Sequence, residues 1–241
     1  MPQVDDALLT LVIGVTGHRD IPAGEYEALA ARVTELLQSL RRDFPALPLV
    51  MLNPLADGGD RIAARAAVAL GVPLFVPLPF AREEYERDFE TPDSLAEFRD
   101  LVSGARIREL PLAPGIRADE VAVRGPARNR QYAQLGMFIS SHSQVLLALW
   151  DGKPSDALGG TAQVVDYHIT NAMPWIEKRD IAPNLLADDE SDLVYHVTCS
   201  RRLAPGSESG GVAAGEAVAK ALDNRPALQL TIVGHSDQRQ R

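Results

Sequence analysis

The stretch LLTLVIGVTGHRD, residues 8–20, decides the fold of this chain. Its first eight residues are a continuous apolar run rich in β-branched side chains, which is typical of a strand buried on both faces of a parallel sheet. The run is followed by Gly17, His18 and Arg19. We therefore predict a buried strand at residues 8–15, with these three residues just beyond its carboxyl end.

Strand-like and helix-like segments alternate after this first run. Apolar runs predict further strands at 47–55, 72–79 and 144–150. Apolar residues at helical spacing, with start and stop signals, predict helices at 24–44, 60–71, 82–89, 94–104, 127–143 and 159–172, and a Pro/Gly-interrupted connection covers 110–126. This alternation predicts an α/β fold: a Rossmann-like, doubly wound, mostly parallel sheet with helices on both faces.

The pattern thins near residue 180. We predict one nucleotide-binding domain at residues 8–180 and a small C-terminal extension at 181–241. A short strand is predicted at 174–179, further strands at 193–199 and 227–234, and a helix after the glycine-rich segment 204–215. A strand so near the end of the sequence leads us to expect a longer natural protein that continues into a further region.

Composition restricts the class of partner. The chain has 33 acidic and 24 basic residues, a formal net charge of −9, and a pI near 5.1. This balance argues against nucleic acid as a partner, because sequence-independent binding needs many cations. A single cysteine, Cys199, rules out an internal disulfide, and we predict no metal and no cofactor. The acidic start and short apolar runs predict neither a signal peptide nor a membrane segment, and hence a cytoplasmic protein.

Three loops repeat one pattern, in which a strand is followed by glycine or small residues and then by polar groups. They are Gly14–Arg19, Asp57–Arg61, and Asp151 through Thr161. The carboxyl ends of parallel strands share one sheet edge, where ligands bind in open α/β folds. Glycines let a ligand approach the backbone, and helix N-termini offer free N–H groups to an anion. The pattern predicts a site for a phosphorylated small molecule.

These glycines also have a purely structural interpretation. Gly58-Gly59 fits a tight turn, and Gly159-Gly160 fits a loop–helix junction. No GxGxxG motif follows the first strand and no GxxxxGK[ST] motif occurs, so an ordinary dinucleotide enzyme and a P-loop NTPase are unsupported. Tyr132 is expected in the core or at a rim rather than in a stacking site.

A fourth segment, GPARNR at 125–130, opens a predicted helix with Arg128 and Arg130. Cations at a helix N-terminus oppose the helix dipole, at about 0.3–1 kcal/mol each when exposed. The sequence shows no compensating group, and a broken local rule of this kind indicates a functional site. We predict an anion bound between these arginines and a neighbouring loop.

Taken together, residues 11–172 resemble the SLOG superfamily of Rossmann-like domains. LADGGD at 55–60 stands where DNA-processing (Smf-type) proteins carry GLAxGIDxxAH, and residues 125–130 are similar to their FPxRNR run. LGGTAQVVD at 158–166 is similar to the PGGxGTxxE motif of Lonely Guy, or lysine decarboxylase-like, phosphoribohydrolases. GVTGHRD and ALWDGKP most resemble the bacterial branch related to the N-terminal region of melastatin-type TRP channels.

The resemblance implies a sensor of a phosphorylated nucleotide or nucleotide-derived signal, of the AMP or ADP-ribose type, in a bacterial signalling or conflict system. It also implies a homodimer, and an effector or membrane module in a longer protein. Loop 17–19 would contact a phosphate, Asp60 a hydroxyl, and Arg130 would neutralise charge. The predicted ligand-binding set is Gly17, His18, Arg19, Gly58, Gly59, Asp60, Arg61, Arg128, Asn129, Arg130, Asp151, Gly159, Gly160 and Thr161.

Two alternatives follow from the same resemblance. The Lonely Guy pattern implies an N-glycosidic hydrolase of nucleoside monophosphates, with Arg130 and Asp166 as catalytic residues that must meet in one crevice. Asp166 is one methylene shorter than the glutamate of that motif, and a displacement of ~1 Å can cost on the order of a hundredfold in rate. The DNA-processing pattern implies single-stranded DNA binding, although Ala64 replaces its histidine.

Overall fold

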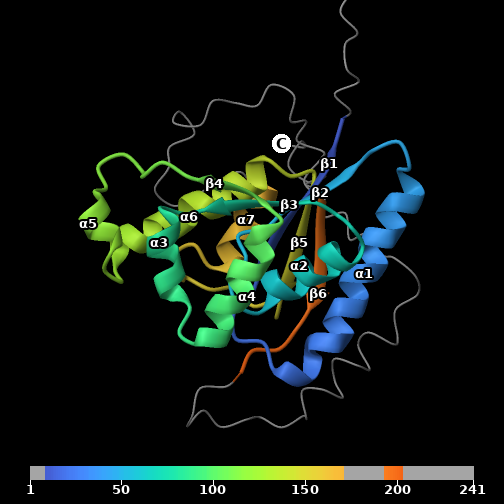
Figure 1. Cartoon of the computed structure of the whole chain (residues 1–241), viewed down its shortest axis with the longest axis horizontal. Coiled ribbons are helices and arrows are strands. Elements are labelled where there is room, and N and C mark those ends of the chain that lie inside the picture. The colour runs from blue at the N-terminus through green and yellow to red at the C-terminus, as the bar shows by residue number, and fades with distance from the viewer. Residues whose placement is uncertain (1–8, 171–192, 203–241) are drawn as a thin grey trace, which may run out of the picture.

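The computed structural model describes residues 9–170 and 193–202. Within them lies one six-stranded sheet in which every paired strand is parallel (Figure 1). Its order is β4-β3-β2-β1-β5-β6. The strands are β1 (Leu11–Gly17), β2 (Leu49–Leu52), β3 (Leu74–Leu78), β4 (Arg106–Glu109), β5 (Val145–Trp150) and β6 (Leu193–Thr198).

Helices cover both faces of this sheet. α1 (Tyr26–Asp43) and α2 (Gly59–Ala69) pack on one face, and α6 (Pro126–Ser141) and α7 (Thr161–Thr170) pack on the other. Side chains alternate along β5 accordingly: Leu147 and Leu149 join the core under α1 and α2, whereas Leu146 and Ala148 join the core under α6 and α7. The α/β, doubly wound prediction is confirmed.

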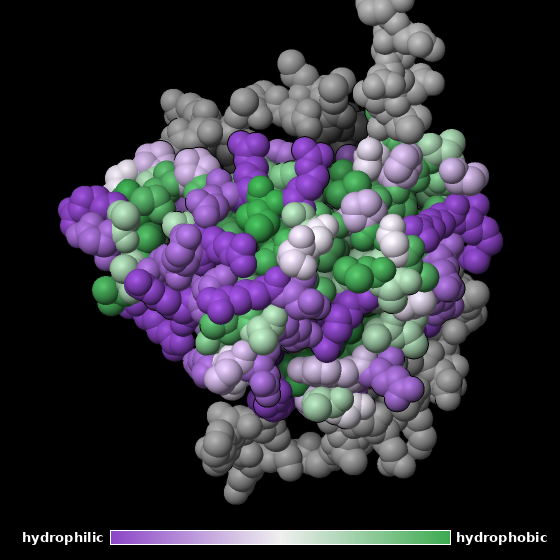
Figure 2. Space-filling model, viewed as in Figure 1, coloured by the Kyte–Doolittle hydropathy of each residue, from purple (hydrophilic) through white to green (hydrophobic). Residues whose placement is uncertain are grey.

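Shorter helices follow the outer strands. They are η1 (Ala23–Glu25), α3 (Arg82–Tyr85), η2 (Glu86–Asp88), α4 (Pro92–Ser103) and α5 (Ala118–Val121). Thr91 caps α4 by accepting a hydrogen bond from the Ser94 amide, with Pro92 at the first helical position. Hydrophilic side chains gather over α3 and α4 on the face shown in Figure 2. No helix of the described part of the chain has the length and apolarity needed to cross a bilayer.

The structure adds one strand that the sequence did not predict. β4 (RIRE) is exposed along its length and carries no apolar run, so it lacked the pattern that predicts a buried strand. Charged residues suit an edge strand because they discourage pairing with other chains. β6 comes from the segment assigned to the C-terminal extension, and it pairs with β5 in the same sheet. The elements predicted at 174–179, 204–224 and 227–234 lie outside the described residues.

The strand order places a topological switch point at β1. The chain proceeds from β1 to β2 and β3 on one side, whereas β5 and β6 lie on the other side. Connections from β1 and β5 therefore diverge to opposite faces of the sheet. A crevice at the carboxyl ends of two such strands is the usual ligand site of an open α/β sheet.

Candidate functional site

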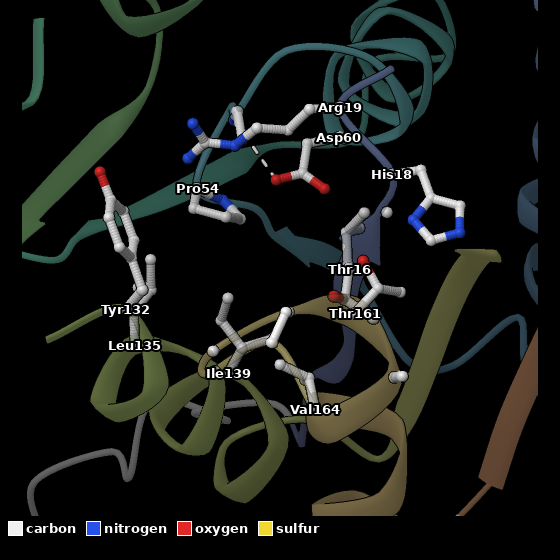
Figure 3. Close-up of a pocket in the computed structure, with 18 of the residues that line it drawn as sticks. Thr16, His18, Arg19, Pro54, Asp60, Tyr132, Leu135, Ile139, Thr161 and Val164 are labelled. Carbon is white, nitrogen blue, oxygen red and sulfur yellow. Dashed lines mark hydrogen bonds between the residues drawn. The ribbon is translucent and has the colours of Figure 1, made fainter. Parts of the chain in front are cut away.

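A cavity of about 450 Å³ lies at this switch point, and we call it the switch-point cavity. Its polar lining comes from the end of β1, the start of α2 and the start of α7, and its apolar lining comes largely from α6 and α7 (Figure 3). Predicted site residues in this lining are Gly17, His18, Arg19, Asp60, Gly159, Gly160 and Thr161. Three of the four predicted loops therefore meet at one cavity.

Close backbone packing accounts for the glycines at the start of α2. A Cβ on Gly59 would lie 3.0 Å from the Cα of Gly17, and one on Gly17 would lie 2.9 Å from the Cα of Gly59. Gly58 has φ +77°, and a Cβ there would overlap the carbonyl oxygen of His18. That oxygen accepts a 2.9 Å hydrogen bond from the Gly59 amide. The glycine pair thus brings α2 against β1, and Gly59 itself does not line the cavity.

The first turn of α7 forms another part of the cavity lining. Gly159 has φ +72° and packs against the α6 backbone, where a Cβ would lie 2.7 Å from the Ala133 amide nitrogen. The Gly159 amide donates to Gln163 Oε1 over 2.8 Å. Thr161 and Ala162 follow in the lining, and the first N–H groups of a helix have no acceptor within it. This turn can bind an anion.

Asp60 is the carboxylic acid of the cavity with the fewest partners. It is 3% exposed, and its Oδ2 accepts a hydrogen bond of 3.3 Å from the Ala56 amide. Its Oδ1 is buried and has no hydrogen-bond partner among the described residues. Burial raises the pKa of Asp60 to about 7, although Arg19, the Ala56 amide and Arg61 each lower it. A buried carboxyl group of this kind is typical of functional sites.

Arg19 lies beside Asp60 at the cavity (Figure 3). Its guanidinium carbon is 5.4 Å from the centre of the Tyr132 ring. Within the described part of the chain, no carboxylate forms a salt bridge with Arg19. The cavity therefore contains a cation whose charge no neighbouring side chain neutralises directly.

His18 lies at the edge of the cavity and is bound to a carboxylate. Its Nε2 is 2.9 Å from Asp151 Oδ1, and both side chains are partly buried. Burial by itself would raise the pKa of Asp151, but the bond with His18, the Lys153 amide and nearby positive charge together lower it. Asp151 does not line the cavity. Its contact with His18 joins the end of β1 to the end of β5.

A second depression, which we call the charged groove, adjoins the cavity. It has a volume of about 910 Å³ and shares Arg19, Asp20 and Tyr132 with the cavity. Of the predicted site residues, Gly58, Arg61, Arg128 and Asn129 lie here instead of in the cavity. The predicted ligand-binding set is therefore divided between the cavity and the groove, except for Gly59, Arg130 and Asp151, which line neither.

Arg61 and Arg128 are both buried, and each forms ion pairs with two carboxylates. Arg61 is 2% exposed and lies 3.1 Å from Asp57 and 2.9 Å from Glu97. Arg128 is 4% exposed, with Glu84 at 2.9 Å and Asp88 at 2.8 Å, and also donates to the Val121 carbonyl. The prediction of an anion at Arg128 assumed that no group compensates its charge. The compensating acids lie about 40 residues away in sequence, and only folding brings them close.

The two residues assigned to hydrolysis lie outside both depressions. Arg130 and Asp166 are exposed, and neither lines the cavity or the groove. Asp166 falls between the buried Val165 and Tyr167 on α7, so helical geometry turns it away from the core. Neither the cavity nor the groove brings these two side chains together, so their meeting in one crevice stays a prediction without support from either depression.

The apolar lining of the cavity could not be identified from the sequence. Tyr132, Leu135 and Ile139 of α6 and Val164 of α7 face it (Figure 3). Tyr132 was expected in the core or at a rim, and its hydroxyl donates to Asp88. Helical spacing predicted that these side chains are buried, but it carries no information about which of them border a cavity. Gly136 lets α6 and α7 approach closely, since a Cβ there would meet Val164.

Comparisons with known proteins add little to this geometry. No protein-family model and no curated protein matches the sequence. The solved structures of DNA processing protein A from Streptococcus pneumoniae and Helicobacter pylori are 17% and 15% identical to this chain, with TM-scores of 0.38 and 0.42. They cover 58% and 66% of this chain, which spans 41% and 62% of theirs. The second structure concerns single-stranded DNA binding by that protein. Likenesses this weak do not identify the ligand of this chain.

Proposed function

We propose that this domain binds a phosphorylated nucleotide or a nucleotide-derived signal in the switch-point cavity. The observation that carries the proposal is that Arg19, which pairs with no described carboxylate, and the first turn of α7 line one cavity at the switch point of a doubly wound sheet. A volume of about 450 Å³ lies within the range of small-molecule sites. The cavity suits a mononucleotide such as AMP.

The lining has a polar part and an apolar part, which suit two different parts of a nucleotide. Arg19, Thr161 and the start of α7 supply donors for a phosphate group. Leu135, Ile139 and Val164 supply an apolar surface that suits a purine ring, on the α6 and α7 side of the cavity (Figure 3). Hydrolysis has no comparable support, because Arg130 and Asp166 lie elsewhere. We therefore propose a binding or sensing role.

A titration with AMP, after a thermal-shift panel of adenine nucleotides, ADP-ribose and cyclic derivatives, tests the proposal. We expect Arg19→Ala to weaken AMP binding at least about tenfold, because a hydrogen bond to a charged group contributes roughly 1.5–3 kcal/mol. Arg130→Ala is the matched control and should leave the Kd unchanged, because Arg130 lines neither depression. Binding by no compound in the panel, or equal losses in both variants, would contradict the proposal.

A further inference from the structure

Asp60 has a buried oxygen for which the described part of the protein provides no hydrogen-bond partner. Its Oδ1 is buried without a hydrogen-bond partner in the described part of the chain, although the side chain lines the cavity. A buried polar atom without a partner usually costs about 1–3 kcal/mol, and such atoms are rare in folded proteins. A ligand group that reaches this oxygen from the cavity would remove this cost.

Burial favours the neutral form of Asp60, whereas the positive charges of Arg19 and Arg61 favour the ionised form and only partly offset burial. Arg19 faces it from the loop after β1 without a salt bridge, and Tyr85 faces it from α3 with its hydroxyl bonded to the Pro54 carbonyl. Asp57 and Arg61 lie on either side of it in the chain and are paired with each other. The other ionisable groups of the lining are His18, Tyr132, Asp20 and Arg201, of which the last two form a salt bridge.

A phosphate held by Arg19 would lie next to Asp60. Two negative groups in one buried place repel each other, so a carboxylate there would oppose binding. A carboxylic acid would instead donate its proton in a hydrogen bond to a phosphoryl oxygen, and its partnerless oxygen would gain a partner. Burial has already raised the pKa of Asp60 to about 7, so the protonated form is accessible near neutral pH.

Building on the proposed function, we infer that Asp60 binds the phosphate group of the ligand as a neutral carboxylic acid, so that binding above neutral pH takes up one proton. Asp60 is then a specificity-determining residue of the cavity. It favours ligands that bring a phosphoryl oxygen to the Asp60 carboxyl group, and it couples their affinity to pH. No bond to the ligand is made or broken.

The test is the Kd of AMP between pH 7.5 and 8.5, where the phosphate, with a second pKa of about 6, is already a dianion. Linkage to one proton predicts about a tenfold weaker affinity for each pH unit in the wild type. Asp60→Asn keeps a hydrogen-bond donor and has no proton to lose, so its Kd should stay level. Asp166→Asn, which changes an exposed carboxylate outside the cavity, should keep the wild-type slope.

Calorimetry in two buffers of different ionisation enthalpy gives a second readout, with uptake of about one proton per AMP expected at pH 8.5. A level wild-type profile overturns this inference while leaving AMP binding intact. So does a slope that persists in Asp60→Asn, because another group would then take up the proton. Absence of AMP binding in every variant and at every pH removes the proposed function, and this inference with it.

Discussion

The switch-point cavity and the charged groove lie side by side and share Arg19 and Tyr132, but their charges are compensated differently. In the groove, Arg61 pairs with Asp57 and Glu97, and Arg128 pairs with Glu84 and Asp88. In the cavity, Arg19 forms no salt bridge with any described carboxylate, and Asp60 has an oxygen without a partner. Arginines that the protein itself neutralises hold the fold together, whereas uncompensated groups indicate a ligand.

Replacing Arg128 should produce the largest effect on stability. Arg128→Ala removes the cation that Asp88 pairs with and leaves the partly buried Glu84 with only the exposed Arg87. Removing one partner of a buried ion pair typically destabilises a protein by about 3–5 kcal/mol, and we expect a loss of free energy of unfolding in this range. Denaturant unfolding followed by circular dichroism measures it.

Arg130→Ala is the control for this experiment, because Arg130 is exposed on the same helix. Its effect should stay within about 0.5 kcal/mol. Equal stability of the two variants would mean that Arg128 is not structural, and the contrast between groove and cavity would no longer hold.

Gly58→Ala should have the next largest effect. The residue would need a left-handed conformation, at roughly 1–2 kcal/mol, and its Cβ would press against the His18 carbonyl, at roughly 1–3 kcal/mol. We expect a loss of about 2–5 kcal/mol in thermal or denaturant unfolding. Gly71→Ala, at the other end of α2, separates the two causes, because its φ is +65° but no atom lies within 4 Å of the added Cβ.

We expect Gly71→Ala to lose only the conformational part, about 1–2 kcal/mol. A Gly58→Ala protein as stable as Gly71→Ala would show that the close approach of α2 to β1 is dispensable. In that case α2 could move away from β1 without loss of stability, although Gly17 and Gly59 are in close backbone contact in this structure.

The smallest measured change is expected when the protein is titrated against single-stranded DNA, the remaining alternative ligand. A strand laid in the groove would meet six arginines, of which four, Arg61, Arg65, Arg124 and Arg128, are already paired with acids. Binding of a flexible strand depends on free cations and stacking aromatics. We expect fluorescence anisotropy of a labelled oligonucleotide to stay level at low salt. A saturable rise that falls steeply with added salt would favour the DNA alternative.

The sequence by itself determined the architecture and the place of the site. Continuous apolar runs such as Val145–Trp150, separated by helices of 3.6-residue periodicity, can bury both of their faces only in a parallel sheet between helices. Glycine-bearing loops after β1, β2 and β5 had to meet at the carboxyl edge, because all parallel strands end there. Hence the sequence predicts His18, Asp60 and Thr161 at one site, and all three line the switch-point cavity.

Only the tertiary structure decided which of the polar residues are free to bind. The sequence shows an arginine at the start of a helix, but it does not show that Glu84 and Asp88 lie against Arg128. Nor does it show that Arg130 and Asp166 are exposed outside the cavity, since one residue along a helix rotates a side chain by about 100°. Compensation of charge depends on distances of a few ångströms between segments far apart in the chain, and only folding sets those distances.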